Sequence, residues 1–83
     1  MNKVLVKLYV PMIEKKYDVW IPLNRSINTI ISLLIKGLSE LNKSSYTPTT
    51  VPTLYNKKTA EIYDLNKKVI DTNIRNGTEL LLI

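Results

Sequence analysis

The fold of this chain is decided by residues 26–42, which have the sequence SINTIISLLIKGLSELN. Apolar side chains recur there three and four residues apart, at Ile27, Ile30, Ile31, Leu34, Ile35, Leu38 and Leu41. This period gathers them on one side of a helix. Ser26 can accept a hydrogen bond from an N–H group of the first turn, and Asn42 tolerates the left-handed backbone that often ends a helix. The segment predicts one amphipathic helix.

Two strands are predicted before this helix. Every second residue of 4–10 (VLVKLYV) is valine or leucine, which gives that strand one apolar face. Pro11 ends it because proline has no N–H group to donate to a ladder. Residues 17–21 (YDVWI) alternate in the same way after a polar bend at 14–16. Two alternating segments joined by a short loop predict a β-hairpin.

A loop and short strands are predicted after the helix. Residues 43–52 (KSSYTPTTVP) carry two prolines and several hydroxyl groups, which is typical of a loop that crosses the surface. Residues 53–56 and 59–63 predict two short strands that turn at Lys57-Lys58. Residues 64–68 (DLNKK) follow as a polar turn.

The last part of the chain is predicted as a helical turn and a strand. Residues 69–74 (VIDTNI) predict one tight turn with Val69 and Ile74 inward, in which Asp71 accepts a backbone N–H. Asn76-Gly77 offers two positions that tolerate positive φ before a strand at 78–83 (TELLLI). This strand and 4–10 are the most apolar, so we expect them to lie centrally and parallel.

This order of elements predicts an α+β fold in a single domain, residues 1–83. The architecture is a ubiquitin-like β-grasp: a mixed sheet of four to five strands with one amphipathic helix, at about 26–42, packed on one face.

The composition argues against an enzyme. The 83 residues include no cysteine and no histidine, which removes thiol nucleophiles, the usual zinc ligands and the commonest general base. Only Gly37 and Gly77 are glycine, too few for a phosphate-binding loop. The carboxylates match no calcium-loop spacing and are interpreted as turn residues. We expect no catalytic residue, no metal and no cofactor.

The order of these motifs resembles ubiquitin along nearly the whole chain. Val4-Leu5-Val6-Lys7 is similar to its first strand, and Ile21-Pro22 before Ser26-Ile27 to its path into the helix. Within that superfamily, residues 71–80 (DTNIRNGTEL) resemble the ending of the YukD-type bacterial ubiquitin-like proteins, and 54–57 (LYNK) is similar too. This resemblance implies a link to type VII (WXG100) secretion.

One departure from ubiquitin bears on mechanism. Conjugation and sulfur transfer need a flexible tail that ends in Gly-Gly, whereas Ile83 follows directly on the last strand. We therefore expect a protein that is not conjugated to others, as the YukD-type resemblance also implies.

The excess of basic residues leaves a second function open. Twelve basic and seven acidic residues give a net charge of +5, which attracts nucleic acid in a salt-dependent way. Five tyrosines interleaved with lysines are the groups that single-strand binders use. The charge is spread over both halves of the chain, so nucleic-acid binding is the alternative and protein binding the favoured function.

The face of the sheet away from the helix is the predicted interaction site. If alternate residues face the helix, the intervening ones face outward. These include several large apolar groups: Leu5, Tyr9, Trp20, Leu81 and Ile83. A one-sided sheet should be polar there, and a tryptophan among aliphatic residues is typical of a binding anchor. Small proteins also expose apolar atoms without any such role.

The sequence thus predicts a cytoplasmic protein-binding accessory factor of a type VII-like secretion system. Its partners are proteins, such as components of that system or a second copy of the chain. The longest apolar run, 30–35, is far shorter than the roughly 20 residues that span a bilayer, so we expect no membrane insertion. A structural subunit of another assembly is a third interpretation.

Overall fold

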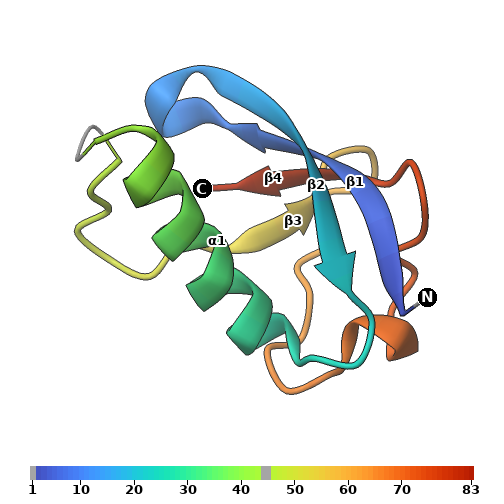
Figure 1. Cartoon of the computed structure of the whole chain (residues 1–83). Helices are drawn as coiled ribbons and strands as arrows, with labels where there is room; N and C mark the ends of the chain where they lie inside the picture. Colours follow the sequence, from blue (N-terminus) through green and yellow to red (C-terminus); the bar gives the residue numbers. More distant parts are fainter. Residues whose placement is uncertain (1, 44–45) are drawn as a thin grey trace.

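Four strands form one mixed sheet in the computed structural model, which describes residues 2–43 and 46–83. They are β1 (Lys3–Val10), β2 (Lys15–Pro22), β3 (Leu54–Asn56) and β4 (Glu79–Leu82), in the spatial order β2-β1-β4-β3. β1 runs parallel to β4 and antiparallel to β2, and β3 runs antiparallel to β4 (Figure 1). The predicted central parallel pair is confirmed.

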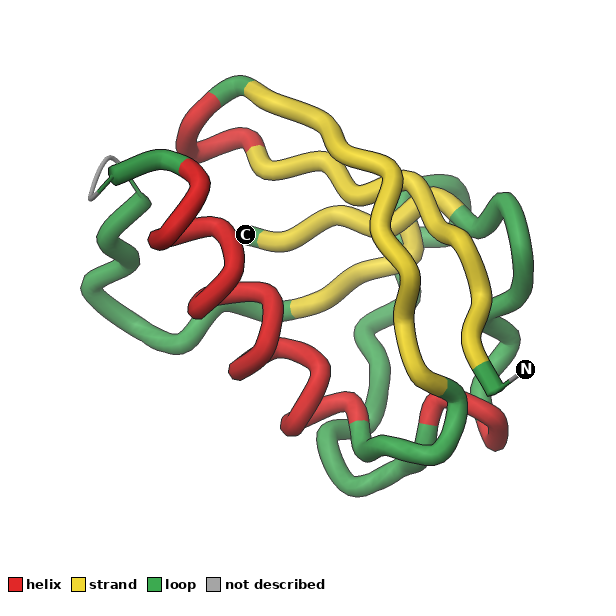
Figure 2. The backbone as a smooth tube through the Cα atoms, viewed as in Figure 1, coloured by secondary structure: helices red, strands yellow, loops and turns green. Residues whose placement is uncertain are grey.

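Helix α1 (Ile27–Leu41) lies across one face of this sheet (Figures 1 and 2). Ser26 caps it as predicted, because its Oγ accepts a hydrogen bond from Thr29 N at 3.2 Å. Five side chains of the predicted stripe are buried: Ile27, Ile30, Ile31, Leu34 and Leu38. Ile35 is partly buried. Leu41 is 69 % exposed, so the prediction that it belongs to the buried stripe of the helix is wrong.

The end of α1 differs from the prediction by one residue. Asn42 has φ −104°, and the left-handed residue is Lys43, with φ 46°. Asn42 closes the helix with its side chain instead, donating from Nδ2 to Leu38 O at 2.8 Å and to Tyr17 Oη at 3.1 Å. These bonds satisfy a helix carbonyl without a left-handed turn at that position.

The core lies between α1 and the inner face of the sheet. The alternating residues Val4, Val6, Leu8 and Val10 of β1 are all buried, as are Leu54, Leu80 and Leu82 of the neighbouring strands. Tyr17, Val19 and Ile21 of β2 share that inner face. The predicted alternation of both hairpin strands is therefore confirmed.

The hairpin loop is shorter than predicted, because β2 begins two residues earlier than the predicted strand at 17–21. A 3-10 turn, η1 (Pro11–Ile13), leads to Glu14 in the left-handed conformation at φ 53°. β2 then begins at Lys15, so Lys15 and Lys16 belong to a strand and not to the bend.

The predicted strand at 59–63 is absent, and the sheet has four strands. Asn56 Oδ1 accepts hydrogen bonds from the N–H groups of Lys58 and Thr59, at 2.9 and 3.1 Å, which closes a turn right after β3. Ala60 has φ 61°, and only an isolated bridge pairs Tyr55 with Ile62. The side chain of Asn56 competes with the ladder and ends it.

The long loop after α1 contributes to the core instead of only crossing the surface. Tyr46 is 2 % exposed and belongs to the buried cluster. Ser39 Oγ donates a hydrogen bond to the carbonyl oxygen of Tyr46 at 3.2 Å, which ties the loop back to α1. Residues 44 and 45 of the predicted loop lie outside the described residues.

The segment before β4 confirms the predicted inward residues but not the cap. Val69 of η2 (Val69–Asp71) and Ile74 are fully buried. Thr72 Oγ1, and not Asp71, accepts the hydrogen bond from Ile74 N, at 3.1 Å. In the following turn Gly77 has φ 87°.

Candidate protein-interaction site

The outer face of the sheet carries side chains from all four strands because alternate residues point away from α1. The register sets their neighbours: Leu5 lies opposite Trp20, Lys7 between Asp18 and Glu79, and Tyr9 beside Leu81. Tyr55 of β3 follows next to Leu81. The predicted side-chain directions of Leu5, Tyr9, Trp20 and Leu81 agree with this register.

Trp20 and Leu5 form the more open of two apolar clusters. The indole of Trp20 is 55 % exposed, and Leu5 is partly buried beside it. The turn before β4 borders them, because Gly77 N donates to Leu5 O and Leu5 N donates to Asn76 Oδ1, both at 2.8 Å. Together with Lys7 and Asp18 they line a shallow hollow of about 270 Å³. An aromatic residue beside an aliphatic one at such a hollow can anchor a protein partner.

Tyr9 and Leu81 form a second cluster that charged side chains partly cover. Lys57 Nζ lies 4.7 Å from the ring centroid of Tyr9, and Tyr9 Oη donates a hydrogen bond to Glu79 Oε1 at 3.3 Å. Lys58 Nζ lies 3.4 Å from Glu79 Oε2. The hydrogen bond from Lys58 holds the pKa of Glu79 below its usual value. These contacts use the polar groups of this cluster within the chain itself.

A charged row separates the two clusters. Asp18, Lys7 and Glu79 lie side by side across β2, β1 and β4. Ile83 follows directly on β4 and is paired with Thr53 through two backbone hydrogen bonds of 2.7 and 3.0 Å. It borders the loop at Pro48–Pro52 and Met12. Of the predicted site residues, Leu5 and Trp20 thus form one pair and Tyr9 and Leu81 another, with the charged row between the two pairs.

Beside β2 the structure has an apolar groove that the sequence interpretation did not include. It has a volume of about 310 Å³ and runs between β2, at Tyr17 and Val19, and α1, at Leu33, Gly37 and Leu41. Leu33 and Leu41 are 51 % and 69 % exposed. The available signal was Leu33, an apolar residue outside the buried stripe of the helix.

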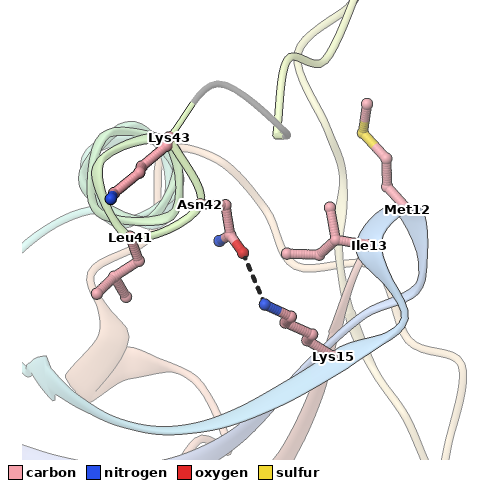
Figure 3. A pocket seen from close by; sticks show the side chains of 6 residues that line it. All are labelled: Met12, Ile13, Lys15, Leu41, Asn42 and Lys43. Atoms are coloured by element: carbon pink, nitrogen blue, oxygen red, sulfur yellow. Dashed lines mark hydrogen bonds between the residues drawn. The ribbon is translucent and has the colours of Figure 1, made fainter.

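A wider hollow of about 670 Å³ lies at the end of this groove, where α1 meets the hairpin loop (Figure 3). Its lining combines aliphatic side chains with polar ones: Met12, Ile13, Lys15, Leu41, Asn42 and Lys43. Lys15 Nζ donates a hydrogen bond to Asn42 Oδ1 at 3.2 Å (Figure 3). Together with its bonds to Tyr17 and Leu38, this contact makes Asn42 a link between β2 and α1.

Tyr46 and Tyr63 are titratable side chains buried in the core. Tyr63 Oη donates to Asn73 Oδ1 at 2.7 Å and accepts from Asn56 Nδ2 at 3.1 Å. Burial raises the pKa of Tyr63 and also that of Tyr46. Within residues 2–43 and 46–83 no group of three or more acidic side chains is arranged to hold a metal ion.

The comparisons with known proteins identify the fold. The ubiquitin-like domain of the type VII secretion system protein EccD1 of Mycobacterium tuberculosis matches over 100 % of this chain and 99 % of its own, with a TM-score of 0.77 and 17 % identity. The chain has a ubiquitin-like fold. No protein-family profile and no curated protein matches it in sequence.

Two further solved structures show how widely this fold is used. A chain of the MycP5-free ESX-5 inner membrane complex matches all of this chain over 21 % of its own length, with a TM-score of 0.78 and 15 % identity. A chain of the toluene 4-monooxygenase HD complex matches with a TM-score of 0.78 and 10 % identity, over 96 % of this chain and 95 % of its own. At such identities the likeness concerns the fold, and function has to be argued from the surface.

No helix in the described part of the chain is long and apolar enough to cross a membrane.

Proposed function

We propose that this chain is a single non-catalytic ubiquitin-like module that binds proteins in the cytoplasm, as an accessory of a type VII-like (WXG100) secretion system. The observation that carries the proposal is the exposed indole of Trp20 beside Leu5, next to the charged side chains of Lys7 and Asp18 on the same face of the sheet. Tryptophan is enriched among the residues that dominate protein interfaces.

The structural likenesses support the secretion setting. One matched domain belongs to a type VII secretion protein, and another lies in a chain of an inner membrane complex. The motif at 71–80 independently resembles the YukD-type proteins. The proposal takes its cellular setting from these two likenesses.

Nucleic-acid binding has less support on the same face. Lys57 lies over the Tyr9 ring and Lys58 pairs with Glu79, so these two cations and this aromatic ring already have partners within the chain. A nucleic acid would have to displace those contacts to use the ring for stacking.

The test is a pull-down of the tagged full chain from cells of its source, with type VII components quantified by mass spectrometry. Trp20→Asp is expected to lower their recovery at least tenfold, because the interface would bury the new carboxylate without a partner. Burial of an unpaired polar group costs about 2–7 kcal/mol, and burial of a charged one costs more. Leu65→Asp is the matched control, since Leu65 is 48 % exposed in a turn far along the chain.

Circular dichroism of both variants checks that the fold is retained. Equal recovery of secretion components by Trp20→Asp and Leu65→Asp would show that the Trp20 cluster is not the binding site. Recovery of none of these components by the unchanged protein would remove the secretion assignment.

A further inference from the structure

One edge of the sheet is closed within the chain and the other is open. Along β3, Asn56 N donates to Glu61 O at 2.8 Å and Tyr63 N donates to Leu54 O at 3.3 Å, so the segment after β3 covers that edge. β2 is the last strand at the opposite side of the sheet. Among the described strands, none pairs with its outer edge. An open strand edge is a template for pairing with another chain.

The direction of the backbone groups on β2 follows from one hydrogen bond. Leu23 N donates to Asn2 O, so this opposed pair is a hydrogen-bonded one. In an antiparallel ladder hydrogen-bonded and non-hydrogen-bonded pairs alternate. Residues at odd positions of β2 therefore bond to β1, whereas Lys16, Asp18 and Trp20 direct their N–H and C=O groups to the open edge. These three alternate residues are enough for a short ladder with another strand.

An uncovered apolar stripe of α1 lies along the same side of the molecule. Leu33, Gly37 and Leu41 are spaced four residues apart, so they follow one line on the helix. Apart from the chain neighbours of Gly37 and the backbone of its own helix, no heavy atom lies within 4 Å of the place where a Cβ would stand, so space remains beside the helix there. The stripe and β2 line the same groove. The monomer thus leaves both a strand edge and a helix stripe uncovered, side by side.

We propose that a second copy of this chain covers both features at once. Around a two-fold axis perpendicular to the sheet, β2 pairs antiparallel with β2 of the second copy, and the two α1 stripes face each other on one side of the joined sheet. Such an interface is self-complementary, because each copy presents the strand edge and the stripe that the other requires. This inference goes beyond the proposed function, and it uses the strand edge and the helix stripe, which adjoin the Trp20 hollow at Asp18 and Trp20.

Charge selects the register of the paired strands. A pairing centred on Tyr17 places Lys16 opposite Asp18 of the second copy, and does so twice by symmetry. A pairing centred on Asp18 would set the two Asp18 carboxylates against each other, which is unfavourable for directly opposed residues. The Tyr17-centred register is therefore the one we assign.

Sedimentation equilibrium over a range of concentrations tests this proposal on the full chain. The unchanged protein is expected to form dimers. Asp18→Lys places a lysine opposite Lys16 at both symmetry-related positions, and it is expected to weaken the dimer about tenfold or more. The charge swap Lys16→Asp with Asp18→Lys is expected to restore it. Asp71→Lys is the matched control, since it makes the same change of charge at an exposed residue of η2.

Leu41→Glu tests the helix stripe independently, with Leu65→Glu as its exposed control. It is expected to weaken the dimer while Leu65→Glu does not. A protein that stays monomeric at all concentrations overturns the proposal, and so does a dimer that Asp18→Lys and Leu41→Glu leave unchanged. Failure of the swap to restore a weakened dimer overturns the assigned register. Leu41 does not line the hollow that Trp20, Leu5 and Asp18 share, so the effect of Leu41→Glu on the dimer is separable from the outcome of the proposed function.

Discussion

Tyr46 offers the sharpest test of how the loop after α1 is held. Its side chain is 2 % exposed in the cluster that also contains residues of the sheet and α1. A buried aromatic side chain removes about 150–250 Å² from water, and truncation of such residues to alanine costs about 3–5 kcal/mol. A chain of 83 residues has a total free energy of unfolding of about 4–12 kcal/mol, at 0.05–0.15 kcal/mol per residue. Tyr46→Ala should therefore remove a large part of the stability.

Urea unfolding followed by circular dichroism measures this loss. With a denaturant slope of about 1 kcal/mol per molar, the midpoint of Tyr46→Ala should fall by about 3 M, or the variant should be unfolded in buffer. Tyr46→Phe keeps the ring and should lose far less. Thr47→Ala changes an exposed neighbour and should have the stability of the unchanged protein. A loss below about 1 kcal/mol in Tyr46→Ala would refute the packing of this loop against the core.

Alkaline pH should destabilise the protein in a way that Tyr63→Phe partly removes. Burial raises the pKa of Tyr46 and of Tyr63 above the unfolded value, so their contribution is complete below about pH 10 and is lost as the pH rises through the raised folded values. Urea midpoints from pH 8 to 11 measure this loss of stability. The same pH dependence in Tyr63→Phe as in the unchanged protein would show that Tyr63 does not contribute to the loss. Gly77→Ala should lower the free energy of unfolding by about 1 kcal/mol, because Gly77 has φ 87°. An unchanged thermal midpoint would show that this turn tolerates a side chain.

Local patterns were sufficient for the elements that carry the fold. The alternation of β1 and the three- and four-residue spacing of α1 are consequences of backbone geometry, so they appear directly in the sequence. The capping bond of Ser26 is equally local, since its acceptor and donor lie three residues apart. The central parallel pair followed from the apolar character of both strands.

Contacts between distant residues account for what the sequence interpretation missed. Tyr46 lies in a segment with the composition of a surface loop, and its burial depends on contacts with residues distant in the sequence. The segment 59–63 has strand-forming residues, but the Asn56 side chain closes a turn that ends the ladder. Leu41 continues the apolar period of α1 beyond the part of the helix that the sheet covers.

The candidate site shows the same division. Alternation gave the direction of Leu5, Tyr9, Trp20 and Leu81, but not the charged row of Asp18, Lys7 and Glu79 that separates them into two pairs, because that row depends on the strand register. The groove along β2 likewise depends on which sheet edge the chain leaves open.

Site-specific photo-crosslinking tests the central claim of protein binding most directly. A photoreactive phenylalanine analogue placed at Trp20, in the full chain in cells of its source, should crosslink to a type VII secretion component on irradiation. The same analogue at Leu65 should not, although the two positions have similar exposure. Crosslinking of secretion components from Leu65 as readily as from Trp20, or from neither position, would contradict the account.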